Sequence, residues 1–218
     1  KLTDVNFNFE NNKEIILQDI NFELKKNEII GIYGQSGSGK STIVDLICGL
    51  LKPTSGTINM DGKNIGDNIF SWRNKFGYVT QSTYLIDDTI KNNIILGDFK
   101  NFDALQFENS IKLSQLEDFV KKLPDGIETN VGERGAMLSG GQIQRIGIAR
   151  AIYHKSEILI FDESTNSLDV DSEQKIIDEV HNLKKFKTVI MISHKMSVLK
   201  ICDKIYELKN KKLKLINE

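Results

Sequence analysis

Residues 34–41 have the sequence GQSGSGKS, which matches the phosphate-binding loop pattern G-x-x-x-x-G-K-[ST]. The apolar run IIGIY at residues 29–33 precedes this loop. Apolar residues at helical spacing follow it, namely Ile43, Val44, Leu46, Ile47 and Leu50. A buried strand, a glycine-rich loop and a helix in this order form a unit that binds nucleotide phosphates. The alternative, an ordinary glycine-rich turn, does not require that strand and helix.

In such a loop, backbone N–H groups and the N-terminus of the helix point at phosphate oxygens. We expect Lys40 to reach the β- and γ-phosphates and Ser41 to bind Mg²⁺. The residues predicted to surround the phosphates are Gly34, Gln35, Ser36, Gly37, Ser38, Gly39, Lys40 and Ser41.

The composition is that of an ordinary globular protein. The 218 residues are 39% hydrophobic and 27% charged, which excludes a disordered or fibrous chain. The 29 basic and 30 acidic residues give a net charge of -1, so no long-range field draws the chain to nucleic acid. A charged ligand must therefore be held locally.

The apolar runs are far shorter than the roughly 20 residues that cross a bilayer, and the start has no signal-peptide pattern. Cys48 and Cys202 lack metal-binding spacing, which fits a reducing cytosolic compartment. The chain opens at Lys1, as expected of a domain cut from a longer polypeptide or of a processed full-length protein.

Patterning predicts strands at residues 2–9, 15–24 and 76–80, with turns at 53–56 and 61–62. A polar helical stretch without a strand covers residues 89–123. Strands and helices then alternate: a helix to Tyr153, a strand at 157–161, a helix at 172–183, a strand at 188–192, a short helix and a hairpin. This order predicts an α/β fold with a mostly parallel sheet, an antiparallel β lobe and a helical lobe.

Two carboxylates, Asp162 and Glu163, follow the apolar run ILIF at residues 158–161. At the carboxyl end of a parallel strand, Asp162 falls beside the phosphate-binding loop, where it is able to hold Mg²⁺. We expect Glu163, the next residue, to lie within reach of a water that attacks the phosphate, as a general base must. The alternative is a solvated acidic pair that caps the next segment.

The sequence LSGGQ at residues 138–142 precedes another helical pattern, and Ser139 is a candidate N-cap. Gly140 and Gly141 leave N–H groups of the first turn uncovered, so this helix start is a second candidate anion site. If it shares a phosphate with the first loop, the site needs two chains. The alternative is a simple N-cap with tolerated glycines.

Two single residues follow predicted strands. His194 comes after the strand at residues 188–192 and is either a structural or solvated histidine or a phosphate sensor. Gln81 ends the strand at residues 76–80, where its amide is able to reach metal or water, although it is also an ordinary loop glutamine.

Together these motifs resemble the nucleotide-binding domain of ATP-binding cassette (ABC) transporters over essentially the whole chain. The resemblance extends the phosphate-binding loop to Thr42. It identifies residues 138–142 as the signature, residues 158–162 as the Walker B strand and residues 167–169 as the D-loop, which ends at Asp169. It also identifies Gln81 as the Q-loop glutamine and His194 as the switch histidine.

Two further stretches resemble the exporter branch of this family, TIKNNI at residues 89–94 and VGERG at residues 131–135. In exporters such segments face the coupling helices of the membrane domain. The chain also departs from the family pattern. Phe9 replaces the usual tyrosine that stacks on adenine, although a phenyl ring still stacks. Ile143 replaces a frequent arginine, and Ser164 and Asn166 replace small residues.

The resemblance implies one domain at residues 1–218, a RecA-like P-loop NTPase core (about 1–80 and 145–218) with a helical subdomain (about 81–144). It implies that ATP and Mg²⁺ bind between the loop of one chain and Ser139, Gly140, Gly141, Gln142 and Asp169 of another. The implied catalytic residues are Glu163, His194, Lys40 and Gln81, and the implied metal-binding residues are Ser41, Gln81 and Asp162.

The implied function is ATP hydrolysis that powers export by a membrane domain, at the cytoplasmic face of the cell (inner) membrane. No direct nucleic-acid partner is expected. Lipids, lipid-linked oligosaccharides, peptides and drugs remain open as substrates. The alternatives are a cassette ATPase that acts on protein or nucleic acid without transport, a nucleotide-binding module without turnover, and a small-molecule kinase.

Overall fold

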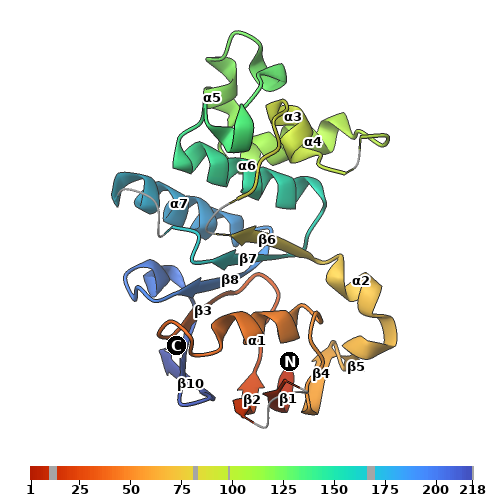
Figure 1. The fold of residues 1–218 in the computed structure, drawn as a ribbon, viewed down its shortest axis with the longest axis vertical. Helices are drawn as coiled ribbons and strands as arrows, with labels where there is room; N and C mark the ends of the chain where they lie inside the picture. Colours follow the sequence, from red (N-terminus) through yellow and green to blue (C-terminus); the bar gives the residue numbers. More distant parts are fainter. Residues whose placement is uncertain (10–13, 81–82, 98, 166–169, 218) are drawn as a thin grey trace.

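The computed structural model describes residues 1–9, 14–80, 83–97, 99–165 and 170–217. Two sheets lie at the centre and at one end of the molecule, and a group of short helices lies at the other end (Figure 1). Within the described part of the chain, no helix is both long and apolar enough to span a membrane.

The larger sheet has six strands in the order β10-β9-β3-β8-β7-β6. Its strands are β3 (Ile29–Tyr33), β6 (Phe76–Thr80), β7 (Ile158–Asp162), β8 (Thr188–Ser193), β9 (Lys204–Lys209) and β10 (Lys212–Asn217). All neighbours pair in parallel except β9 and β10, which form the terminal hairpin. The predicted mostly parallel sheet is therefore confirmed, and the strand ends that were predicted lie within one residue of the observed ones.

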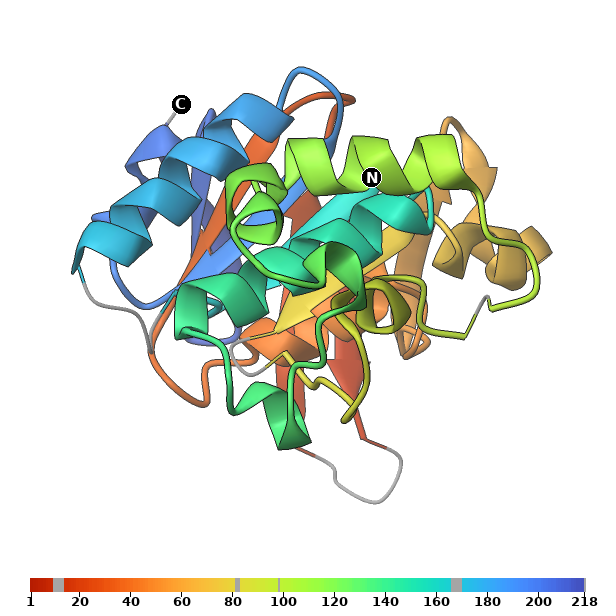
Figure 2. The same ribbon diagram turned by 90° about the horizontal axis from the view of Figure 1, so that it is seen from above.

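Helices cover both faces of this sheet. Helix α1 (Lys40–Ile47) lies on one face, and α6 (Gly140–Tyr153) and α7 (Val170–Leu183) lie on the other (Figures 1 and 2). Successive side chains of a strand point to opposite faces. Ile30 and Ile32 of β3 accordingly belong to the core with α1, whereas Ile29 belongs to the core with α6 and α7.

Helix α1 is shorter than its apolar pattern indicates. It ends at Ile47, and Leu50, predicted as part of its apolar face, lies beyond the helix and is 57% exposed. Gly49 has φ 71°, a left-handed conformation that commonly ends a helix. The prediction for Leu50 is therefore wrong because the glycine stops the helix first.

The smaller sheet is antiparallel, as predicted, with the order β2-β1-β4-β5. It contains β1 (Leu2–Asn8), β2 (Ile15–Phe22), β4 (Ser55–Met60) and β5 (Lys63–Asn64). The turn predicted at residues 53–56 is wrong for its last two residues, because β4 begins at Ser55. Only Ile58 of β4 is fully buried, so the segment lacks an apolar alternation. Pairing with β1 determines this strand.

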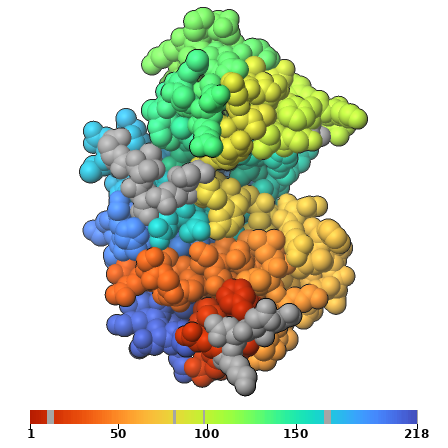
Figure 3. All heavy atoms as spheres, in the orientation of Figure 1, coloured from red at the N-terminus to blue at the C-terminus, as the bar shows by residue number. Residues whose placement is uncertain are grey.

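The helical lobe packs on α6 and contains α3 (Ile90–Ile94), α4 (Ala104–Leu113) and α5 (Glu117–Lys121). The predicted helical stretch is thus confirmed, and its described residues form three separate helices. Asp103 begins α4 by accepting a hydrogen bond from the Gln106 backbone N–H at 3.0 Å. Helix α2 (Ile69–Arg73) lies next to the antiparallel sheet. Figure 3 shows the helical lobe and the antiparallel lobe at opposite ends of the molecule.

Candidate nucleotide-binding site

The phosphate-binding loop connects β3 to α1, as the sequence predicts. Gly39 is the N-cap of α1 with φ 102° and ψ 14°, a conformation that a residue with a Cβ rarely adopts. No side chain caps this helix. The N–H groups of its first turn are therefore left for a ligand, and the helix dipole favours an anion there.

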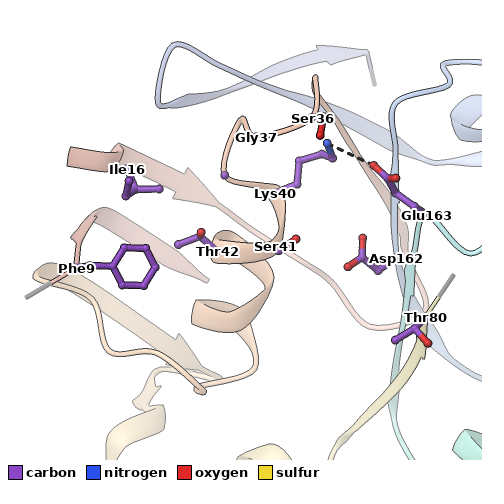
Figure 4. Close-up of a pocket in the computed structure, with 11 residues that line it drawn as sticks. Phe9, Ile16, Ser36, Gly37, Lys40, Ser41, Thr42, Thr80, Asp162 and Glu163 are labelled. Atoms are coloured by element: carbon purple, nitrogen blue, oxygen red, sulfur yellow. Dashed lines mark ion pairs between the residues drawn. The ribbon is translucent and has the colours of Figure 1, made fainter. Parts of the chain in front are cut away.

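A cavity of about 760 Å³ opens beside the loop. Its described lining residues are Phe9, Ile16, Ser36, Gly37, Gly39, Lys40, Ser41, Thr42, Thr80, Asp162 and Glu163. Figure 4 shows Phe9 and Ile16 at one side of the cavity, Asp162 and Glu163 at the other, and the loop between them. An apolar end and a charged end suit a ligand with a ring at one end and phosphates at the other.

Lys40 is the buried cation of the site, with a side chain only 7% exposed. Its Nζ donates hydrogen bonds of 2.9 Å to the carbonyl oxygens of Gly34 and Gln35. It also lies 3.5 Å from Oε1 of Glu163 (dashed in Figure 4). A buried ammonium group is stable only with such partners. The loop thus holds a positive charge at the floor of the cavity.

Glu163 lies between Lys40 and His194. Its Oε1 is 3.5 Å from Nδ1 of His194 as well as 3.5 Å from Nζ of Lys40. The backbone of Glu163 has φ 47°, which is strained for a residue other than glycine. Its N–H donates to the carbonyl oxygen of Ile192 on β8 at 3.0 Å, which stabilises this conformation.

The sheet register explains why these groups meet. Asp162, the last residue of β7, pairs with Thr80 of β6 and with Ile192 of β8. The carboxyl ends of the three parallel strands therefore lie at one edge, next to the loop that follows β3. His194 is 48% exposed at this edge, in the position expected for it.

Asp162 has a partner that sequence reasoning missed. The hydroxyl of Tyr78 donates a hydrogen bond of 2.7 Å to Oδ2 of Asp162. Burial and this hydrogen bond raise the pKa of Tyr78, so the phenol stays protonated at neutral pH. Burial and the nearby charge of Asp162 also raise the pKa of Asp45 on α1. Tyr78 is two residues before Thr80 on the same strand, so the two side chains are on the same face of the sheet. Because Thr80 lines the cavity, this spacing is the signal in the sequence that could have identified Tyr78.

The oxygen donors of the site fit Mg²⁺. The hydroxyl of Ser41 and the carboxylate of Asp162 both line the cavity, and Mg²⁺ is held by a few such oxygens together with phosphates. Within the described residues, no cluster of three His, Cys, Asp or Glu side chains forms a complete metal cage.

The signature segment opens α6, as predicted, and lies apart from the loop cavity. The hydroxyl of Ser139 accepts a hydrogen bond from the N–H of Gln142 at 3.3 Å, and Oε1 of Gln142 accepts one from the N–H of Ser139 at 2.8 Å. This is a capping box. Ser139 and Gly140 are exposed, and none of residues 139–142 is among the cavity lining described above.

The remaining predicted residues have the following positions. Phe9 lies at the cavity rim, 48% exposed, with its ring edge-on to Phe7 at 5.0 Å. Gly34, Gln35 and Ser38 belong to the loop but are not among the described lining residues. Gln81 and Asp169 lie outside the described residues.

Comparison with known proteins identifies the family. The family sequence model described as "ABC transporter" matches residues 17–166, well over half of the chain. The chain belongs to the ABC transporter family. This confirms the family predicted from the motifs, and with it an ATP-binding domain of the ATPase class.

Similar proteins in this family are named as ATP-binding/permease proteins, and one of them as a multidrug export protein. A probable ABC transporter ATP-binding/permease protein of Haemophilus influenzae is 39% identical over 206 residues, covering 94% of this chain and 37% of that protein. A putative multidrug export ATP-binding/permease protein of Staphylococcus aureus is 42% identical over 207 residues, covering 94% of this chain and 36% of that protein. This ABC chain therefore spans little more than a third of the length of these relatives.

A solved structure of a bacterial Atm1-family ABC exporter with ATP bound matches this ABC chain with a TM-score of 0.84 at 35% identity. The match covers 97% of this chain and 37% of the exporter chain. It confirms the predicted fold, including the antiparallel sheet beside the parallel one.

Proposed function

We propose that this chain is the ATP-hydrolysing unit of an ABC exporter. The observation that carries the proposal is the position of Glu163 in the cavity lining, where its Oε1 lies 3.5 Å from Nζ of Lys40 and 3.5 Å from Nδ1 of His194. A base that is able to accept the proton of an attacking water, and a cation and an imidazole that are able to stabilise negative charge, suit the hydrolysis of a phosphoanhydride.

The nucleotide would lie along the cavity. The loop N–H groups and Lys40 would hold its phosphates, and Phe9 would stack on its base. The ammonium group of Lys40 contacts two carbonyl oxygens and Glu163 in this structure. Phosphate oxygens would compete with Glu163 for this cation, because both are anions within its reach. Binding would thus free the carboxylate to accept a proton.

Ser41, Asp162 and Gln81 would hold Mg²⁺. The ion, when bound, supplies a positive charge that offsets the negative charge of the phosphate oxygens. Glu163 would accept a proton from the attacking water, and His194 would contact the terminal phosphate. Lys40 would stabilise negative charge on the transferring group.

A second chain would complete the site. The capping box of Ser139 and Gln142 presents an exposed helix start away from the cavity of its own chain. In a head-to-tail pair, Ser139, Gly140, Gly141, Gln142 and Asp169 of the partner subunit would close over the nucleotide. Binding would close the pair, and hydrolysis would reopen it.

The membrane domain would lie on the helical lobe, at the cytoplasmic face of the cell (inner) membrane. The two stretches that resemble exporters lie side by side, since Ile90 N–H donates to Thr129 O and Val131 N–H donates to Asp88 O, each at 3.0 Å. Next to them, Tyr84 and Met137 are 64% and 74% exposed. The similarity to ATP-binding/permease proteins supports a membrane domain as the partner.

The test is the variant Glu163→Gln, with Glu108→Gln on the exposed face of α4 as a matched control. We expect Glu163→Gln to bind ATP but to lose activity by about 100- to 10,000-fold, the range for removal of a general base. With ATP, the variant should elute as a dimer in size-exclusion chromatography, and the wild-type rate per chain should rise with protein concentration.

A Glu163→Gln variant that hydrolyses ATP at the wild-type rate would contradict the base assignment. A monomeric variant together with a rate independent of concentration would contradict the shared site, and with it the mechanical basis for transport.

A further inference from the structure

We infer that Tyr78 is a positioning residue that orients the carboxylate of Asp162 toward the magnesium ion of the nucleotide complex. This inference rests on the proposed function, because it takes Asp162 as a metal-binding residue. Tyr78 lies on β6 and belongs to none of the motifs described above.

The sheet register brings the two residues together. Asp162 ends β7 and pairs with Thr80, the last residue of β6, while Tyr78 pairs with Ile160. Residues two apart on a strand share a face, so Tyr78 lies on the same face of β6 as Thr80, which lines the cavity. The Tyr78 side chain is long enough to cross to the end of β7, where its hydroxyl is 2.7 Å from Oδ2 of Asp162.

In the hydrogen bond between these residues, Tyr78 is the donor and Asp162 is the acceptor. A phenol has one hydrogen to donate, and Asp162 as a carboxylate only accepts. A hydrogen bond from a hydroxyl to an ionised carboxylate is short and about twice as strong as one between neutral groups. The contact therefore restricts the rotation of the Asp162 carboxylate through its Oδ2, and would hold this group in the orientation in which it meets the ion.

Removal of the hydroxyl alone separates this role from packing. Tyr78 is 39% exposed, so Tyr78→Phe keeps the ring and its contacts and leaves no buried void. Tyr84→Phe, at a tyrosine that is 64% exposed and outside the cavity lining, is the matched control. Neither substitution removes a group that we expect to touch the nucleotide.

The experiment measures Mn²⁺, used as the probe for Mg²⁺, by electron paramagnetic resonance in the presence of ATP, with Glu163→Gln as the background to prevent turnover. We expect Tyr78→Phe to weaken Mn²⁺ binding about tenfold, the lower end of what the loss of a hydrogen bond to a metal ligand causes. The affinity for ATP in EDTA should be unchanged, and Tyr84→Phe should match the background in both measurements.

Two outcomes would overturn the inference in distinguishable ways. Equal Mn²⁺ affinity for Tyr78→Phe and the background would show that the hydroxyl does not position the metal ligand. If Asp162→Asn in the same background also keeps full Mn²⁺ affinity, the metal assignment in the proposed function fails as well. A weaker ATP affinity of Tyr78→Phe in EDTA would identify a structural role instead.

Discussion

We expect that loss of the ion pair between Arg145 on α6 and Glu179 on α7 would lower the free energy of unfolding of the domain. Arg145 follows the signature on α6, and its Nε and Nη2 both donate to Oε1 of Glu179 on α7, at 2.9 and 2.5 Å. The Glu179 side chain is 2% exposed, and within the described part of the chain its Oε2 has no hydrogen-bond partner. Arg145 is therefore the main group that compensates this buried charge, with a smaller contribution from Lys175.

Arg145→Met keeps the aliphatic length and removes both hydrogen bonds. Removal of one partner of a buried pair destabilises a protein by about 3–5 kcal/mol. Arg145 is 21% exposed, so water screens part of the interaction, and we expect about 3 kcal/mol, the lower end of that range. In a domain of this size, that corresponds to a melting temperature lower by about 6–12 °C.

The stability lost in Arg145→Met should increase with pH. Burial raises the pKa of Glu179 above its ordinary value of 4.5, against the lowering effect of Arg145. A raised carboxyl pKa in the folded state stabilises the fold below the unfolded pKa, and this contribution is lost as pH rises through the folded pKa. Without Arg145, the pKa of Glu179 in the folded state rises further. The stability of the variant therefore continues to fall with increasing pH in a range where the stability of the wild type has already levelled off.

The assay is urea unfolding of the wild type and Arg145→Met at pH 5 and pH 8, followed by circular dichroism. Lys121→Met, which removes an exposed i,i+4 pair with Glu117 at 3.9 Å, is the control and should change stability by about 0.5 kcal/mol or less. The double variant Arg145→Met/Glu179→Leu should recover most of the loss, because no charge then remains buried. An unchanged midpoint for Arg145→Met at pH 8 would refute the reasoning.

Three further substitutions, at two positions, test the local structure by thermal unfolding. Ser139→Ala removes the hydroxyl that accepts a hydrogen bond from Gln142 N–H, so it should lower the free energy of unfolding by about 1 kcal/mol. It should also weaken the ATP-dependent dimer. Ser139→Gly, which caps a helix nearly as well, should lower the free energy of unfolding by only a few tenths of a kcal/mol. Gly77→Ala would place a Cβ 2.5 Å from the Cβ of Ala151, and should destabilise the domain by about 1–3 kcal/mol. An unchanged melting temperature would contradict this prediction, because it would mean that α6 moves away from β6 at no cost in free energy.

Much of the fold was predictable because its signals are local. The apolar runs before the phosphate-binding loop and before Asp162 predict buried strands, and both are strands of the central sheet. Parallel pairing places the carboxyl ends of β3, β8 and β7 at one edge of the sheet, the edge at which the loop begins and Asp162 lies. By contrast, β4 has one fully buried residue and was missed, because its pairing partner β1 lies about fifty positions earlier in the chain.

The sequence by itself determined the family, the parallel core and the residues of the contiguous motifs, since each motif is a short run whose spacing carries its chemistry. Only the tertiary structure decided that Tyr78 holds Asp162, that Arg145 holds Glu179, and that Glu163 lies at equal distance from Lys40 and His194. The reason is physical: such contacts join side chains from different strands and helices, and their existence depends on sheet order and helix packing, which no local pattern encodes.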